Sequence, residues 1–278
     1  RHLQACLNAW RDIVDKRLFV SGGTSQDEHF QADHVLQDNG RAHVSETCVT
    51  TTWIQFNLVL LQITGESGFA TEIERSTYNH LMAAQNPNGE DWCYFTPLRG
   101  RKPYLKAPEI TCCQSSGPRG LALAPQWAYL KARHGDADML VVNTFETSGA
   151  TLELGGQRVT VEQHSGFPRT GELRLRLRLE RPARFALRLR RPQWASAFSL
   201  PGAVERDGWL TIAPRDWRDG DELTPSLPLA ATLVDGRHGN RGKAALKWGP
   251  LVLALDEQAN PDLPPAHRLA WSAPSLQV

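Results

Sequence analysis

The amino-acid sequence predicts two structural parts, a helical part followed by an antiparallel β-sandwich. Apolar residues recur at helical spacing up to about residue 135, and beyond it they alternate with polar residues as in half-buried strands. Residues 173–179 show the second pattern most clearly, because leucine and arginine alternate there without exception. We therefore expect helices in residues 1–135, a sandwich in residues 136–258 and an irregular tail in residues 259–278.

Four segments of the first part carry the apolar stripes that are typical of helices. They are residues 3–14, 53–61, 69–82 and 121–130. The second segment is apolar almost all round, as in a deeply buried helix. Turn-rich connections separate the segments and contain glycine, proline or asparagine at 21–24, 86–89 and 100–108.

Short alternating segments joined by Ser-Gly and Gly-Gly turns predict the strands of the second part. They are residues 140–145, 151–154, 158–161, 173–179, 184–189, 208–212, 244–247 and 251–255. The arginines of 173–179 could suggest a surface for nucleic acid, but no aromatic stacking positions lie among them. A solvated sheet face is the better interpretation of this strand.

Composition excludes several classes of protein. The 278 residues include 31 Lys+Arg and 30 Asp+Glu, so net charge gives no general attraction to nucleic acid or to anionic membranes. No run of 18 apolar residues is present, which argues against a membrane-spanning helix. The sequence begins at an arginine and continues into a helical pattern without a signal-like apolar segment.

The cysteines suggest free thiols. Five cysteines are an odd number, and two of them are adjacent, which makes a framework of disulfides unfavourable. Reduced thiols favour roles as metal ligands or nucleophiles, and they favour a reducing compartment such as the cytoplasm. The five are Cys6, Cys48, Cys93, Cys112 and Cys113.

Two polar clusters precede predicted helices. In the first, Glu46 and Cys48 are two residues apart, so in an extended segment their side chains would point the same way. In the second, Cys112 and Cys113 are followed by Ser115 and Ser116 as candidate caps and by Pro118 as a candidate first-turn residue. Helix N-termini lower thiol pKa values, so thiolates are plausible in both clusters.

One glutamate and three cysteines could complete a four-coordinate zinc site. The spacing alone leaves an alternative equally open, in which Cys48 and Cys113 are small buried residues and Glu46 is a helix cap. A third polar segment, residues 26–29, is an acidic loop that follows two glycines.

Several short motifs resemble, in order, the signature segments of glycoside hydrolase family 127, which contains the β-L-arabinofuranosidases. In the first part they are FVSGG at 19–23, EHF at 28–30, ETC at 46–48, ERSTYN at 74–79, YFTPL at 94–98 and CC at 112–113. In the second part they are LRLRRPQWA at 187–195, WRDGD at 217–221 and KAALKWGPL at 243–251. Together the motifs extend over about 230 residues, and their order makes them far more specific than any single motif.

The resemblance implies a fold, a cofactor and a reaction. It implies the C-terminal part of an (α/α)6 barrel followed by a β-sandwich, so we expect an N-terminally truncated member of the family. It also implies a retaining exo-glycosidase with a zinc-bound cysteine nucleophile, acting on an arabinofuranoside-type carbohydrate. Position by position, the zinc ligands are Glu46, Cys48, Cys112 and Cys113, the nucleophile is Cys112, the general acid/base is Glu28, and the residues lining the sugar pocket are Glu74 and Tyr94.

Each assignment has a plainer alternative. Cys112 could be only a structural ligand, Glu28 a solvated loop acid beside Asp27, Glu74 a pairing residue and Tyr94 a core aromatic. The competing function is a non-catalytic carbohydrate-binding or structural fragment of such an enzyme. An incomplete barrel would expose apolar surface, so association into homo-oligomers is a further expectation. We expect neither nucleic acid nor a membrane as a partner.

Overall fold

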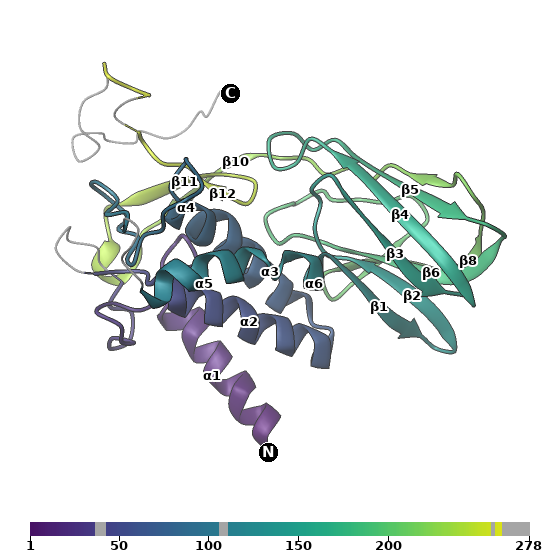
Figure 1. The fold of residues 1–278 in the computed structure, drawn as a ribbon, viewed down its shortest axis with the longest axis horizontal. Coiled ribbons are helices and arrows are strands. Elements are labelled where there is room, and N and C mark those ends of the chain that lie inside the picture. The colour runs from purple at the N-terminus through teal and green to yellow at the C-terminus, as the bar shows by residue number, and fades with distance from the viewer. Residues whose placement is uncertain (37–42, 106–110, 257–258, 263–278) are drawn as a thin grey trace.

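The computed structural model describes residues 1–36, 43–105, 111–256 and 259–262. In Figure 1 the helices lie at one end of the molecule and the two larger sheets at the other. Within the described residues every α-helix precedes the first strand, which confirms the predicted order of helices and strands. Across these ranges no helix combines the length and the apolar character that crossing a membrane requires.

The helical part is built around a helix that is buried on one face. The expectation that this helix is buried almost all round is wrong, because Val59 and Ile63 of α2 are 51% and 60% exposed. The opposite face of α2 is buried, and its core contains Ile54, Leu58 and Leu61 together with Phe69 and Ile73 of α3. The elements are α1 (His2–Lys16), α2 (Thr47–Thr64), α3 (Ser67–Ser76), the π-helix η1 (Thr77–Leu81), α4 (Met82–Ala84), α5 (Cys112–Leu121) and α6 (Ala124–Ala128).

The fourth predicted helix is wrong in part. Helix α6 ends at Ala128, and the chain continues as strand β1 (Tyr129–His134). Strand β1 forms a hairpin with β2 (Ala137–Val142) through Gly135, which has a φ of +61°. The apolar residues of 121–130 fit a helix locally, but pairing with β2 decides the structure, because cross-strand contacts override a weak local pattern.

Two larger sheets share one hydrophobic core. The first has the order β1-β2-β6-β8-β7, with β6 (Ala183–Arg190), β7 (Val204–Arg206) and β8 (Trp209–Trp217). The second has the order β3-β4-β5-β9, with β3 (Ser148–Leu154), β4 (Gln157–Ser165), β5 (Leu173–Leu179) and β9 (Glu222–Leu223). The expectation of purely antiparallel pairing is wrong at one place, since β2 and β6 are parallel.

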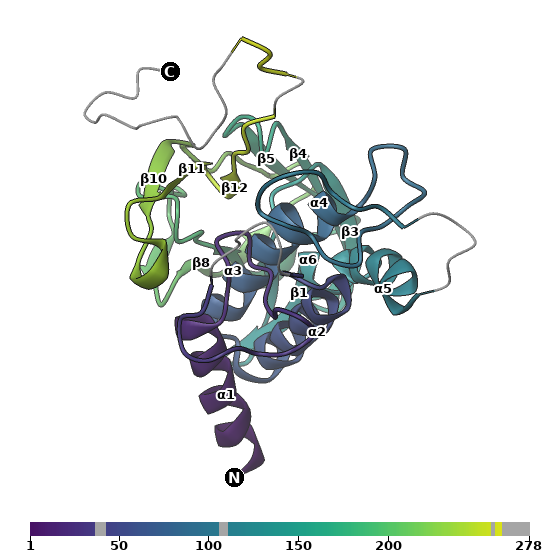
Figure 2. The same cartoon turned by 90° about the vertical axis from the view of Figure 1, so that its left-hand side faces the viewer.

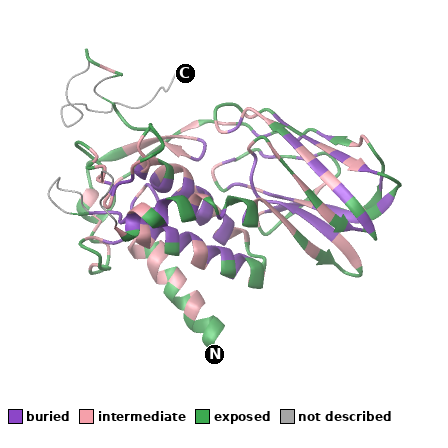
Figure 3. Ribbon diagram, viewed as in Figure 1, coloured by how far each residue is buried: buried purple, intermediate pink, exposed green. Residues whose placement is uncertain are grey.

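Strand β5 has the predicted alternation. Its leucines are buried in the shared core and its arginines lie on the other face, as the burial colours of the strands show in Figure 3. Arg178 pairs with Glu162 of β4 at 3.1 Å, and Arg176 pairs with Glu222 of β9 at 3.7 Å. Two of the three arginines therefore have ion-pair partners within the sheet, which supports the solvated-face interpretation.

A third sheet lies beside the helices, although it comes last in the sequence. It has the order β10-β11-β12, with β10 (Ala231–Asp235), β11 (Ala244–Trp248) and β12 (Leu251–Val252) (Figure 2). Asn79 of η1 joins it by donating to the Pro250 carbonyl at 2.9 Å and accepting from the Val252 amide at 2.7 Å. The boundaries at residues 135 and 258 stay predictions, and residues 263–278 of the predicted tail lie outside the described residues.

Helix α5 packs so closely on Trp92 that Gly117 tolerates no side chain. A Cβ atom at Gly117 would stand 2.2 Å from two atoms of the buried Trp92 ring. We expect Gly117→Ala to lower the free energy of unfolding by about 1–3 kcal/mol, because overpacking displaces the ring or the helix. Urea unfolding followed by circular dichroism measures the change.

Gly68 in α3 provides a matched control for this substitution. Its Cβ would meet Trp10 at 3.6 Å, an ordinary contact, so Gly68→Ala should be neutral or stabilising. Equal stability of Gly117→Ala and the parent protein would show that the Trp92 contact is not a constraint.

Candidate metal centre and active site

The four predicted metal ligands lie together at the starts of two helices. Glu46 is the residue before α2 and Cys48 lies in its first turn, while Cys112 and Cys113 are the first two residues of α5. One ligand atom from each of the four residues lies within 4.8 Å of the others. The packing of α5 on α2 therefore brings together two clusters that lie far apart in the sequence.

The local structure differs from the expectation in both clusters. Cys48 is helical rather than extended, so it meets Glu46 through the first turn of α2. Helix α5 begins earlier than predicted, and Thr111 is its N-cap, with a side-chain oxygen that accepts from the Gln114 amide at 3.3 Å. Threonine is a strong cap because it satisfies an otherwise unpaired amide of the first turn. Pro118 consequently lies inside α5 rather than in its first turn.

The distances within the cluster suit a shared metal ion. The sulfurs of Cys48 and Cys113 are 3.3 Å apart, and the Cys113 sulfur is 4.0 Å from Glu46 Oε1. Ligands of a tetrahedral zinc ion at about 2.3 Å would lie about 3.8 Å from one another. Cys113 and Glu46 are buried, whereas Cys112 is the one exposed member.

The electrostatics of the cluster also favour a cation. Burial raises the pKa of Glu46, and the nearby charge of Glu28 raises it further. Burial likewise raises the pKa of Cys48 to about 11 and raises the pKa of Cys113. The expectation of lowered thiol pKa values is therefore wrong for these two cysteines, because burial outweighs the effect of the helix N-termini. In the described part of the chain no lysine or arginine forms an ion pair with Glu46. A dication would compensate these acidic groups, and three sulfurs with one carboxylate form a donor set that suits zinc.

Tyr94 connects the predicted acid to the predicted nucleophile. Its hydroxyl donates to Glu28 Oε1 and lies 3.8 Å from the sulfur of Cys112. The hydrogen bond to Glu28 is the main cause of a raised Tyr94 pKa, so the phenol stays protonated at neutral pH. The carboxylate and the thiol thus both lie close to one phenol oxygen.

Glu28 lies at the tip of a tight hairpin. Asp27 and Glu28 have φ values of +49° and +65°, and the flanking residues Gln26 and His29 pair with each other. Two successive positive φ values are the signature of a type I′ turn, which favours glycine or asparagine. An acidic pair in this conformation is unusual, and such strain is concentrated at functional sites.

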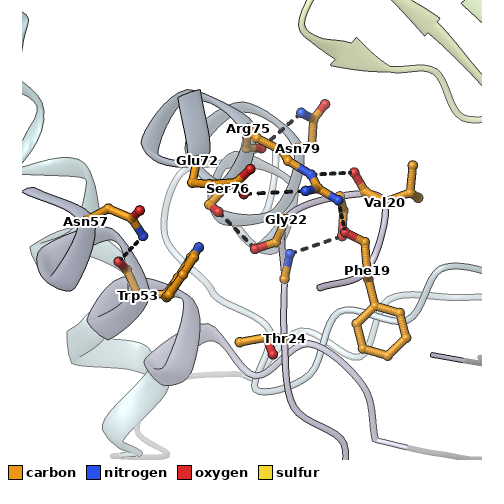
Figure 4. A network of polar contacts seen from close by, with 12 residues as sticks. Phe19, Val20, Gly22, Thr24, Trp53, Asn57, Glu72, Arg75, Ser76 and Asn79 are labelled. Atoms are coloured by element: carbon orange, nitrogen blue, oxygen red, sulfur yellow. Dashed lines mark hydrogen bonds and ion pairs between the residues drawn. The ribbon is translucent and has the colours of Figure 1, made fainter. Parts of the chain in front are cut away.

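The segment that leads into this hairpin is anchored to α3 (Figure 4). Arg75 donates to the carbonyls of Phe19 at 2.7 Å and Val20 at 3.3 Å, and Ser76 Oγ donates to the Gly22 carbonyl at 2.9 Å. A Cβ at Gly22 would approach Ser76 within 2.8 Å, and φ there is +80°. The two glycines of the FVSGG motif therefore serve close packing, and Arg75 and Ser76 are supporting residues that sequence reasoning missed.

Glu74 lies in a buried ion pair that joins the helical part to the sheets. One of its carboxylate oxygens accepts from Arg190 of β6, and the other accepts from Trp194 Nε1 at 2.8 Å. Arg190 is fully buried and also donates through Nε to the Asn143 carbonyl at 2.8 Å. Both oxygens of Glu74 have donors within the chain, and its role in sugar binding stays a prediction.

Two family profiles match the chain. Residues 1–126 match the family profile described as β-L-arabinofuranosidase, GH127 catalytic domain, and residues 139–229 match the GH127 middle domain. A comparison with curated protein sequences returned no significant match.

Solved structures show the same fold. A GH127 β-L-arabinofuranosidase from Geobacillus stearothermophilus has 25% sequence identity and a TM-score of 0.80, with 90% of this chain and 42% of that chain covered. A GH127 β-arabinofuranosidase has 24% identity and a TM-score of 0.76, with 87% and 42% covered. A structure described as a glycoside hydrolase has 21% identity and a TM-score of 0.76, with 87% and 46% covered.

The chain spans less than half the length of these solved structures. The two family profiles nevertheless match most of it, in the order in which the helices and sheets occur. This chain belongs to glycoside hydrolase family 127.

Proposed function

We propose that the chain carries the catalytic centre of a retaining, exo-acting β-L-arabinofuranosidase. In this proposal Cys112 is the nucleophile and Glu28 is the general acid/base. The observation that supports it best is the Tyr94 hydroxyl, which is hydrogen-bonded to Glu28 and 3.8 Å from the Cys112 sulfur, beside the cluster of metal-ligand type. The helices would form the C-terminal part of an (α/α)6 barrel, and the two larger sheets would form the β-sandwich.

The first step transfers the sugar to the enzyme. The Cys112 thiolate attacks the anomeric carbon, so a C–S bond forms while the bond to the leaving oxygen breaks. Glu28, protonated at this stage, donates its proton to that oxygen. Cys112 is exposed, so a sugar can reach its sulfur without unfolding the site.

The second step releases the sugar with retained configuration. Glu28, now a carboxylate, takes a proton from water, and this water attacks the anomeric carbon as the C–S bond breaks. The thiolate of Cys112 and the protonated Glu28 are thereby restored. Tyr94 contributes by holding the Glu28 carboxyl on the Cys112 side of the hairpin.

The metal would be held by Glu46, Cys48, Cys112 and Cys113. When bound, zinc keeps its ligating sulfurs deprotonated at neutral pH. Burial raises the pKa of Cys48 and of Cys113, so deprotonation of these two thiols would depend on the bound cation. The residues therefore fit zinc by donor type, spacing and charge.

The test is metal content and hydrolysis measured together. Protein loaded with zinc and desalted should retain about one ion per chain and release 4-nitrophenol from 4-nitrophenyl β-L-arabinofuranoside. Cys113→Ser and Glu46→Gln should lose both properties, because each removes one ligand of a four-coordinate site. Cys6→Ser is the matched control, since Cys6 lies on α1 and packs against the helical core.

Two results would contradict the proposal. The first is a parent protein that retains no zinc, and the second is hydrolysis that is unchanged after a chelator has removed the metal. No observation on the described residues favours the alternative of a non-catalytic carbohydrate-binding fragment.

A further inference from the structure

The backbone of Ser45, next to the proposed site, is hydrogen-bonded to three other segments of the chain. It is completely buried, has a φ of +58° and immediately precedes Glu46. Its amide donates to the Ser25 carbonyl at 3.1 Å. Its carbonyl accepts from the Thr96 amide at 3.1 Å and from His80 Nε2 at 2.9 Å.

These hydrogen bonds tie together the segments that carry the proposed functional groups. Ser25 leads into the hairpin of Glu28, and Thr96 follows Tyr94 by two residues in the chain. Because all the bonds meet at Ser45, a shift of this residue would change the placement of the hairpin, the tyrosine and the adjacent metal ligand together. Such a shift would matter, because small displacements of groups at a catalytic site cause large losses of rate.

His80, in the helical part, provides the side-chain hydrogen bond to Ser45. It lies in the π-helix η1 and is 1% exposed. Burial lowers its pKa to about 4, so the ring is neutral at neutral pH. A carbonyl oxygen can only accept, so Nε2 carries the proton and Nδ1 is an acceptor. Within the described residues Nδ1 has no hydrogen-bond partner, so the bond to Ser45 is the polar contact of this ring.

Gly23 shows how tightly His80 and Ser45 are packed. A Cβ at this position would stand 2.5 Å from Ser45 Oγ and 3.2 Å from His80 Cγ. The His80 ring can therefore pack this close to Ser45 because residue 23 has no side chain. A π-helical turn such as η1 is itself a feature that is frequent at functional sites.

We infer that His80 is a positioning residue, which fixes Ser45 through its Nε2–H group and thereby sets the relative placement of Glu28, Tyr94 and Glu46. This inference rests on the proposed function, because it assigns His80 to the same site. Within the described residues His80 has no hydrogen bond to the four candidate ligands and is 1% exposed, so its effect passes through the backbone of Ser45.

The experiment compares His80→Gln with His80→Leu in the full chain. Glutamine can present an amide Nε2 donor to the Ser45 carbonyl, whereas leucine fills the space without a donor. Zinc affinity, measured by competition with a chromophoric chelator, should fall about tenfold or more in His80→Leu and stay close to that of the parent in His80→Gln. Amide hydrogen exchange in residues 24–30, 43–48 and 94–98 should rise only in the leucine variant.

His164→Leu is the matched control, because His164 is exposed on β4 and lies far along the chain from the site. If His80→Leu behaves as the parent, or if leucine and glutamine cause equal losses, the hydrogen bond is not what positions the site. A parent protein that binds no zinc overturns the proposed metal centre, while hydrogen exchange still decides the role of His80.

A second variant covers the case in which His80→Leu does not fold. Gly23→Ala places a methyl group between Ser45 and His80 and leaves both side chains present. It should lower zinc affinity and raise exchange in the same three segments. Normal values of both quantities in folded Gly23→Ala would overturn the inference.

Discussion

Replacing Cys112 with serine should lower the rate of 4-nitrophenyl β-L-arabinofuranoside hydrolysis on the order of 10⁴-fold or more, measured with zinc in excess because Cys112 is also a proposed zinc ligand. A serine hydroxyl is a much weaker acid and a weaker nucleophile than a thiol, so the first step of the proposed reaction would fail. Cys112 is exposed at the start of α5, so the substitution should leave the fold intact. Initial rates at saturating substrate measure the loss.

Alkylation tests the same residue without a mutation. Of the five cysteines only Cys112 is exposed, so iodoacetamide should modify it first, and activity should fall in proportion to its labelling. Tryptic mass spectrometry measures the labelling. Cys6→Ser serves as the control for both experiments, and full turnover in Cys112→Ser or in alkylated protein would show that Cys112 is not the nucleophile.

The second large effect is on stability. Arg190→Leu should lower the free energy of unfolding by about 3–5 kcal/mol, because it removes one partner of a buried ion pair and leaves the other uncompensated. The Arg190 side chain is 0% exposed and that of Glu74 is 4% exposed. The pair also joins α3 to β6, so the loss should weaken the contact between the helical part and the sheets.

Two further variants separate the ion pair from general effects of substitution. Arg206→Leu removes an arginine whose ion pair with Asp207 is exposed, and it should change stability by less than about 1 kcal/mol. The double variant Glu74→Leu with Arg190→Leu should be less destabilised than the sum of its single variants, since neither charge is left alone. Urea denaturation of the parent, the two single variants, the double variant and Arg206→Leu measures these changes, and additive effects would contradict a coupled pair.

Much of the fold could be predicted because periodicity is a local property. The order of helices and strands and the alternation along β5 both follow from how side chains of neighbouring residues are distributed. The exposed face of α2, with Val59 and Ile63, could not be predicted, because its residues are as apolar as those of the buried face. The start of α5 was predicted too late, because Thr111 and Ser115 are both acceptable caps by residue type. Long-range pairing also decided β1 and the parallel contact between β2 and β6.

The site could be predicted as far as residue type and motif allow. Glu46, Cys48, Cys112 and Cys113 carry donors that suit zinc, and the structure places them together. Nothing in the sequence distinguishes the buried His80 from the exposed His164. The contact of Tyr94 with Glu28 likewise had no signal beyond the family resemblance.

By itself the sequence determined the family, the order of helices and strands and the chemical character of the candidate ligands. The tertiary structure alone decided which side chains meet: Arg190 with Glu74, His80 with Ser45, and Tyr94 with both Glu28 and Cys112. The physical reason is that each of these contacts joins residues far apart in the chain. Such contacts are selected by the burial and hydrogen bonding of the whole fold, and no local pattern of residues records them.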